Sequence, residues 1–80
     1  MSGYWAIGRV RIDYLLALAT HVRVEVFDVQ GRRVRTLVDE WRPVGRHTTM
    51  WNDRGSGSGL YFVRVRAGGR TATQRLIRMR

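Results

Sequence analysis

The chain has 80 residues, a length that fits a single domain and that buries only about 60% of its unfolded surface. It contains no cysteine, which excludes a disulfide framework and a cysteine-ligated zinc cluster. The net charge is +9 and all fifteen basic residues are arginine, so nucleic acid, anionic lipid and acidic glycan are possible partners. The arginines are spread along nearly every predicted strand, which favours a solvated basic surface over a nucleic-acid site.

The N-terminal part of the chain divides into a short leading segment and a first strand. Residues 1–8 contain two glycines and no regular pattern, and we expect them to be loosely ordered ahead of a domain at residues 9–80. Val10, Ile12 and Tyr14 then alternate with charged residues, which predicts a strand. No apolar run approaches the roughly 20 residues of a membrane-spanning helix.

The most regular pattern follows, in residues 22–38. Val22, Val24 and Val26 occupy alternate positions, so a strand here places valine on one face. Asp28 suits the first position of a type I turn, and Gly31 suits the last position, where a positive φ is often required. This stretch predicts a β-hairpin with a buried valine face.

The second half continues in short strands. Pro43 predicts a loop or sheet edge over residues 39–44. A strand is expected over residues 46–51, with His47 and Trp51 on one face, followed by a loop over residues 52–59 that is rich in glycine and serine.

The last two strands are expected to form a second hairpin. Residues 60–66 alternate and put Tyr61 inward, and the Gly68-Gly69 pair predicts a tight turn into a strand over residues 71–79. Leu76 and Ile77 are adjacent, which leaves the register of that strand open. Six strands with no 3.6-residue period predict an all-β, antiparallel sandwich.

Few residues suit catalysis or metal binding. His21 and His47 are the only imidazoles, and we see no acid placed to orient either ring as in a catalytic triad. The six acids are scattered and show no metal-ligand spacing. We therefore expect a protein that is not an enzyme and that has no catalytic, cofactor or metal site.

The aromatic residues fall into two groups. Trp51, Tyr61 and Tyr14 lie on predicted inner faces and are expected in the core, which is favoured over a stacking platform for bases or sugars. Trp5, Trp41 and Phe62 are less easily buried and are our candidates for an exposed contact surface.

Several short motifs, taken in order, resemble a known family. They are Ile12-x-Tyr14-x-Leu16, His21-Val-Arg-Val-Glu-Val-Phe-Asp28, Gly31-Arg-Arg-Val34-x-x-Leu37, Gly45-Arg-His47-x-x-x-Trp51, Ser58-Gly59-Leu60-Tyr61-Phe62-Val63-Arg64-Val65 and Arg75-Leu-Ile. Their joint order over residues 10–80 resembles the C-terminal sorting domains of proteins exported by the type IX secretion system. It is also similar to the immunoglobulin-like domain of flagellar hook-capping proteins. The short segment Asn52–Gly57 looks more like the sorting type.

The resemblance implies a fold, a location and partners. The fold would be a small immunoglobulin-like β-sandwich of six to seven strands. The domain would be a secretion and cell-surface anchoring signal within a larger protein that crosses the periplasm, with secretion-machinery proteins and an upstream cargo domain as partners. The resemblance places the signal in the final hairpin, with Arg75, Arg78 and Arg80 as candidate recognition residues. A hook-capping-like structural module and a small basic nucleic-acid-binding domain are the alternatives.

Overall fold

The computed structural model describes residues 5–7, 9–52 and 57–79, and for residues 5–7, 78 and 79 it describes the backbone only. The described residues form seven strands: β1 (Trp5–Ile7), β2 (Val10–Leu16), β3 (Thr20–Asp28), β4 (Arg33–Arg42), β5 (Gly45–Trp51), β6 (Gly59–Ala67) and β7 (Arg70–Met79). This part of the chain contains no helix with the length and apolarity that a membrane crossing requires. The all-β prediction is confirmed.

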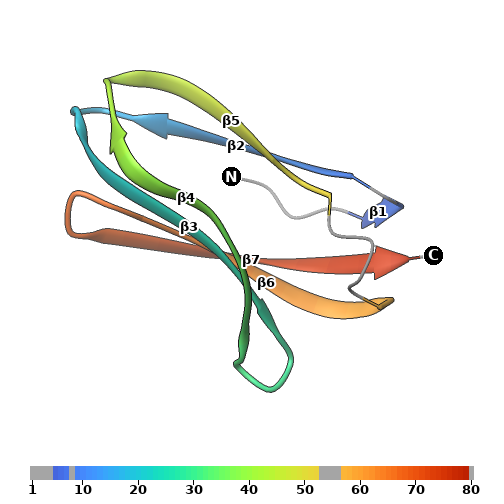
Figure 1. The fold of residues 1–80 in the computed structure, drawn as a ribbon. Helices are drawn as coiled ribbons and strands as arrows, with labels where there is room; N and C mark the ends of the chain where they lie inside the picture. Colours follow the sequence, from blue (N-terminus) through green and yellow to red (C-terminus); the bar gives the residue numbers. More distant parts are fainter. Residues whose placement is uncertain (1–4, 8, 53–56, 80) are drawn as a thin grey trace.

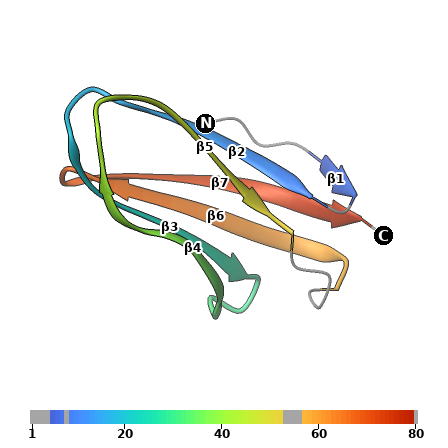
Figure 2. The same cartoon turned by 45° about the horizontal axis from the view of Figure 1, so that its top comes forward.

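The strands make two sheets that face each other. The larger sheet has the order β1-β7-β6-β3-β4, and the smaller sheet pairs β2 with β5. Figures 1 and 2 show β2 and β5 lying over one face of the larger sheet. Neighbouring strands are antiparallel except for β1, which runs parallel to β7. The predicted small β-sandwich is therefore confirmed.

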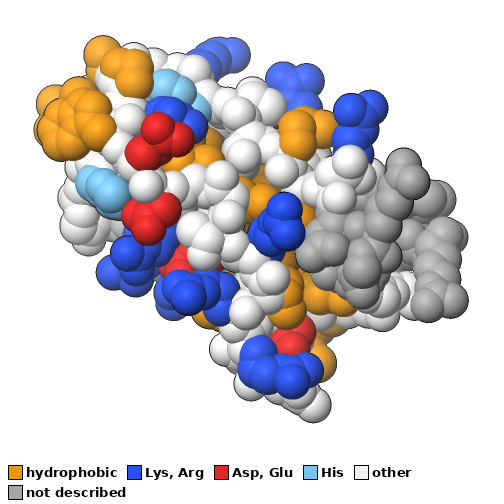
Figure 3. Space-filling view, viewed as in Figure 1, with side chains coloured by type: hydrophobic (Ala, Val, Ile, Leu, Met, Phe, Trp, Pro, Cys, Tyr) orange, Lys and Arg blue, Asp and Glu red, His pale blue; other side chains and the backbone are white. Residues whose placement is uncertain are grey.

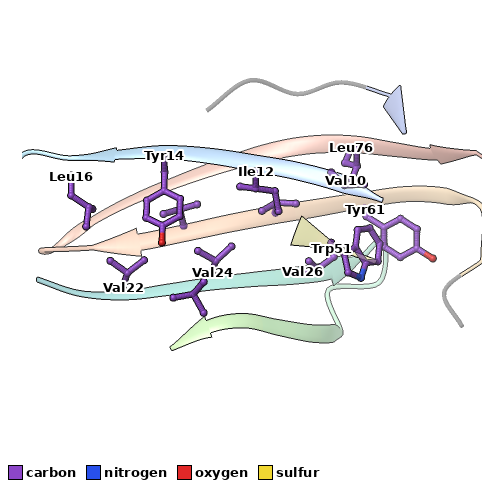
Figure 4. Packing of buried hydrophobic residues seen from close by; sticks show 13 residues of the cluster. Val10, Ile12, Tyr14, Leu16, Val22, Val24, Val26, Trp51, Tyr61 and Leu76 are labelled. Atoms are coloured by element: carbon purple, nitrogen blue, oxygen red, sulfur yellow. The ribbon is translucent and has the colours of Figure 1, made fainter. Parts of the chain in front are cut away.

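The core lies between the two sheets and is made by the inward positions of β2 to β7 (Figure 4). Its buried members are Val10, Ile12, Tyr14, Leu16, Val22, Val24, Val26, Val38, Trp51, Tyr61, Val63, Val65 and Leu76. Trp51 is fully buried and meets the Tyr61 ring edge-on, with ring centroids 4.9 Å apart. Both residues are in the core as predicted. Trp51 lies beside Val26 in Figure 4, whereas Val24 lies further along the sheet.

The turn between β3 and β4 is organised by Asp28. Its carboxylate accepts the backbone N–H groups of Gln30 and Arg32, each at 2.9 Å, and the Gly31 N–H donates to the Asp28 carbonyl at 3.0 Å. These hydrogen bonds, the N–H of Arg32 first, hold the pKa of the Asp28 carboxyl below its ordinary value. Gly31 has φ +83°, which confirms the positive φ predicted for this position.

β4 is longer and less regular than predicted. It continues to Arg42 as an edge strand of the larger sheet, and Pro43 then separates it from β5 in the other sheet. Its pairing with β3 shifts register twice, once near Val24 and once near Val26. Such β-bulges bend a strand and increase its twist, and both lie in the half of β4 that follows the β3–β4 turn.

The two ends of the chain also differ from expectation. Residues 1–8 were expected to be loosely ordered, but Trp5–Ile7 is a strand, because β7 supplies hydrogen-bonding partners that the local sequence pattern does not reveal. Residues 1–4 and 8 lie outside the described residues. On β7, Leu76 is buried and Ile77 is 48% exposed. The pair therefore alternates between faces, and β6–β7 pairing needs no bulge.

Replacing Trp51 with alanine is expected to lower the free energy of unfolding by about 3–5 kcal/mol, because the substitution opens a cavity in the centre of the core. Chemical denaturation measures this loss. Met50→Ala is the matched control, since Met50 is the neighbouring residue on β5 and is 42% exposed. If Trp51→Ala unfolds at the same denaturant concentration as Met50→Ala, the core assignment is wrong.

Replacing Gly31 with valine is expected to destabilise the domain by roughly 1–3 kcal/mol, because a β-branched residue is strained at a positive φ. Apart from the two chain neighbours, no atom lies within 4 Å of an added Cβ, so the Cβ itself is not crowded. Gly57→Val provides the comparison: its Cβ also meets open space, and its φ is outside the left-handed region. Equal melting temperatures for the two variants would contradict backbone strain as the cause.

Candidate functional site

The outward face of the larger sheet carries a cluster of arginine and aromatic side chains around one buried carboxylate. Glu25 alternates with the core valines of β3 and therefore points away from the core, yet it is only 2% exposed. Arg64 on β6 and Arg33 on β4 each place a guanidinium nitrogen 3.1 Å from a different Glu25 oxygen. The two arginines therefore cover the carboxylate from both neighbouring strands.

These contacts determine the charge state of Glu25. Burial by itself raises the pKa of the carboxyl, but the hydrogen bonds from Arg64 and Arg33 outweigh burial and hold the pKa below its ordinary value. A buried carboxylate that loses such partners is costly. The cluster of Glu25, Arg33 and Arg64 therefore has a structural role, which is to stabilise the sheet.

The aromatic part of this face lies next to the buried carboxylate. The Arg64 guanidinium carbon is 4.5 Å from the centroid of the Phe27 ring, which is a cation–π contact. Phe27 is opposite Phe62 on β6, and Phe62 is opposite Arg75 on β7. Two half-buried aromatic residues and an exposed arginine thus form a row across three strands.

The structure describes the three predicted recognition residues to different extents. Arg75 is exposed in the middle of β7. The backbone of Arg78 pairs with Gly59 and with Ala6, and its side chain is outside the described part. Arg80 lies outside the described residues. Their role in recognition stays a prediction.

The three candidate contact residues lie in different places. Phe62 is half-buried on the outward face of β6, and the backbone of Trp5 pairs with Ile77 in β7. Trp41 is 65% exposed near the end of β4. Trp41 and Phe62 therefore do not belong to one continuous surface, and the side chain of Trp5 is outside the described part.

Other exposed apolar residues lie at the same end of the sandwich as Trp41, which the sequence pattern did not reveal. Leu15, Leu18 and Val44 are 71%, 77% and 62% exposed, and all three belong to the end of β2 or to the turns that follow β2 and β4. Figure 3 shows hydrophobic side chains gathered at the upper left, over the end of the sandwich where β4 passes into β5. An exposed apolar group of this kind is a candidate protein-contact surface.

The histidines have partners that sequence reasoning only partly identified. His21 Nε2 donates to Asp39 Oδ1 at 2.6 Å, so the expectation that no acid is placed to orient a histidine was wrong. The β3–β4 register brings these residues together. The hydrogen bond from His21 is the main cause of a lowered pKa at Asp39. His47 donates to the Pro43 carbonyl at 2.7 Å and stacks on Tyr14, at the core margin as predicted.

No group of three or more His, Asp or Glu side chains in the described part of the chain could hold a metal ion. One further feature is the edge of β7, because the described part of β1 pairs only with Ile77–Met79. Residues 70–76 have no strand partner on that side among the described residues.

Comparison with known proteins gives two positive findings. A model of the family described as "Secretion system C-terminal sorting domain" matches residues 6–79. A 1.4 Å crystal structure of an uncharacterized protein from Bacillus anthracis str. Ames is similar, with a TM-score of 0.64 and 9% identity over 98% of this chain and 77% of that chain. At this identity the likeness concerns the fold alone. No curated protein matches the chain.

Replacing Glu25 with glutamine is expected to lower the free energy of unfolding at neutral pH by about 1–3 kcal/mol, because two charge-assisted hydrogen bonds are weakened. The pKa of Glu25 is lowered on folding, so its stabilisation is present above the unfolded value of 4.5 and is lost as pH falls through the folded pKa. The difference between parent and variant should therefore shrink in acid. Urea denaturation at several pH values measures it.

Glu40→Gln is the charge-matched control for this experiment. Glu40 is on the neighbouring strand, with a side chain 60% exposed and paired to Arg42 at 3.0 Å. Exposed pairs contribute roughly 0–1 kcal/mol. A Glu25→Gln loss that is no larger than this control, or that stays constant down to the acid limit, contradicts the structural role of the Glu25 carboxylate.

Proposed function

The chain belongs to the secretion system C-terminal sorting domain family, and from this premise we propose that it is the non-catalytic part of a larger protein that the type IX secretion machinery recognises. Members of this family are parts of secreted or cell-surface proteins. The observation that carries the proposal is the match over residues 6–79, nearly the whole chain. This match favours sorting over the hook-capping and nucleic-acid alternatives.

The proposed recognition surface is the final hairpin, from Leu60 to Arg80. Two features of the described residues support it. Residues 70–76 of β7 have no strand partner on one side among the described residues, and such an edge can hydrogen-bond to an added strand. Arg75 is exposed on the same strand and supplies a charged group beside that edge. Arg78 and Arg80 extend the same basic segment along the sequence.

Trp41 is the proposed contact for a protein partner, at the end of the sandwich where β4 passes into β5. It is 65% exposed, and three further exposed apolar residues, Leu15, Leu18 and Val44, belong to the same end of the sandwich. Tryptophan is enriched at the centres of protein interfaces because its large ring gains much from desolvation. We propose that this surface contacts either the secretion machinery or the upstream cargo domain. We propose the same role for Trp5 and Phe62.

A reporter with a signal peptide, fused ahead of residues 6–80, tests the proposal in a host with type IX secretion. The reporter is expected at the cell surface or in the medium. Replacing Arg75, Arg78 and Arg80 together with glutamine should reduce export and leave the reporter in the periplasm. Cell fractionation and immunoblotting measure the distribution, and circular dichroism of the purified variant checks the fold.

A second triple variant separates recognition from total charge. Arg9, Arg35 and Arg46 are exposed on strands β4 and β5 or next to β2, and their replacement with glutamine removes the same charge. This control should be exported like the parent. If both triple variants are exported equally well, the three C-terminal arginines are not the recognised feature. If the intact domain leaves the reporter in the periplasm, the sorting proposal itself is wrong.

A further inference from the structure

A cleft with a volume of about 460 Å³ lies where the start of β3 meets the turn between β6 and β7. Both segments are at the left end of the sandwich in Figures 1 and 2. They are in contact, because a Cβ added at Gly68 would lie 3.7 Å from the Thr20 hydroxyl oxygen. The cleft is therefore formed by segments that are far apart in the sequence.

Three arginines line this cleft: Arg23, Arg66 and Arg70. Arg23 and Arg66 are directly opposite each other on β3 and β6, an arrangement in which like charges repel. Asp39 approaches Arg23 at 3.6 Å and also accepts the hydrogen bond from His21. Within the described residues no carboxylate is within ion-pair distance of Arg66 or Arg70. The positive charge in the cleft is thus only partly compensated.

Neutral hydrogen-bond donors accompany these charges. The lining includes Thr20 and Thr71, whose hydroxyl groups can donate, and the two turn residues Gly68 and Gly69. Both glycines have a positive φ, 55° and 78°, and they keep this wall of the cleft free of side chains. An anion can therefore approach the backbone here more closely than at a turn with larger residues.

We propose that this cleft binds a phosphate-class anion, meaning a pyrophosphate or a phosphate ester. Guanidinium groups pair with phosphoryl oxygens through two parallel hydrogen bonds, and three such groups suit a ligand with more than one negative charge. The cleft gathers its charges at one end of the sandwich, which favours a compact anion over a polymer that follows a strip of charge. This inference is independent of the sorting function.

Titration of the purified chain with inorganic pyrophosphate at low ionic strength tests the site. Arg66→Gln with Arg70→Gln should weaken binding by about tenfold or more, since each lost contact is a charge-assisted hydrogen bond. Arg9→Gln with Arg35→Gln removes the same net charge from exposed positions outside the lining and should change affinity less than about twofold. Isothermal titration calorimetry measures both.

Asp39→Asn is expected to have the opposite effect on pyrophosphate affinity. It removes the carboxylate that competes for Arg23 and should strengthen pyrophosphate binding. Chemical-shift changes at the amides of Gly68, Gly69 and Thr71 should accompany binding in the parent and locate the anion. Failure of the parent to bind, or equal losses in the two double variants, would overturn the proposal.

Two further probes distinguish between a lipid and a soluble source of the phosphoryl group. Vesicles that contain phosphatidic acid, compared with vesicles of phosphatidylcholine alone, report a lipid phosphate; competition by pyrophosphate is expected if the cleft is used. Binding of soluble pyrophosphate without vesicle binding assigns the cleft to a soluble anion. A random-sequence DNA oligonucleotide that binds more tightly than pyrophosphate and weakens equally in both double variants would show diffuse nucleic-acid binding and overturn the proposal.

Discussion

β3 is the strand on which the domain depends, because at its centre, Val24–Val26, it is buried on both faces by two different kinds of interaction. Its valines pack between the sheets with no exposed surface, and its outward Glu25 is covered by arginines from the two strands that flank it. A strand that is buried on both faces is usually apolar throughout. On β3 the outward side instead carries the charged Glu25. β4 and β6 must therefore lie where Arg33 and Arg64 can reach this carboxylate.

This arrangement divides the arginines into groups with different physical roles. Arg33 and Arg64 neutralise Glu25, and Arg64 also covers an aromatic ring. Arg32 supports the β3–β4 turn through Asp28. Arg66, Arg70 and Arg75 have no such carboxylate among the described residues. The final hairpin and the adjoining cleft are thus one region in which, among the described residues, no ion pair offsets the charge of these three arginines.

Most of the fold follows from local patterns, whereas most of the surface chemistry does not. Strict alternation identifies β3 and β6, and the Asp28–Gly31 turn can be predicted from the chemistry of its end residues. β1 has only three residues and gains its order from β7, so its own sequence contains no signal. The bulges in β4 likewise depend on its partner.

The sites were harder to predict because they depend on contacts between distant segments. The His21–Asp39 contact and the arginine cleft both require the strand register, which no spacing along the chain reveals. Arg75, Arg78 and Arg80 were chosen by resemblance to a family, and the structure describes the side chain of Arg75 alone.

The parallel pairing of β1 with β7 has a mechanical consequence. Tension that pulls the start of β1 away from the end of β7 acts along both strands in opposite directions, so the hydrogen bonds between Trp5–Ile7 and Ile77–Met79 resist together in shear and do not open one at a time.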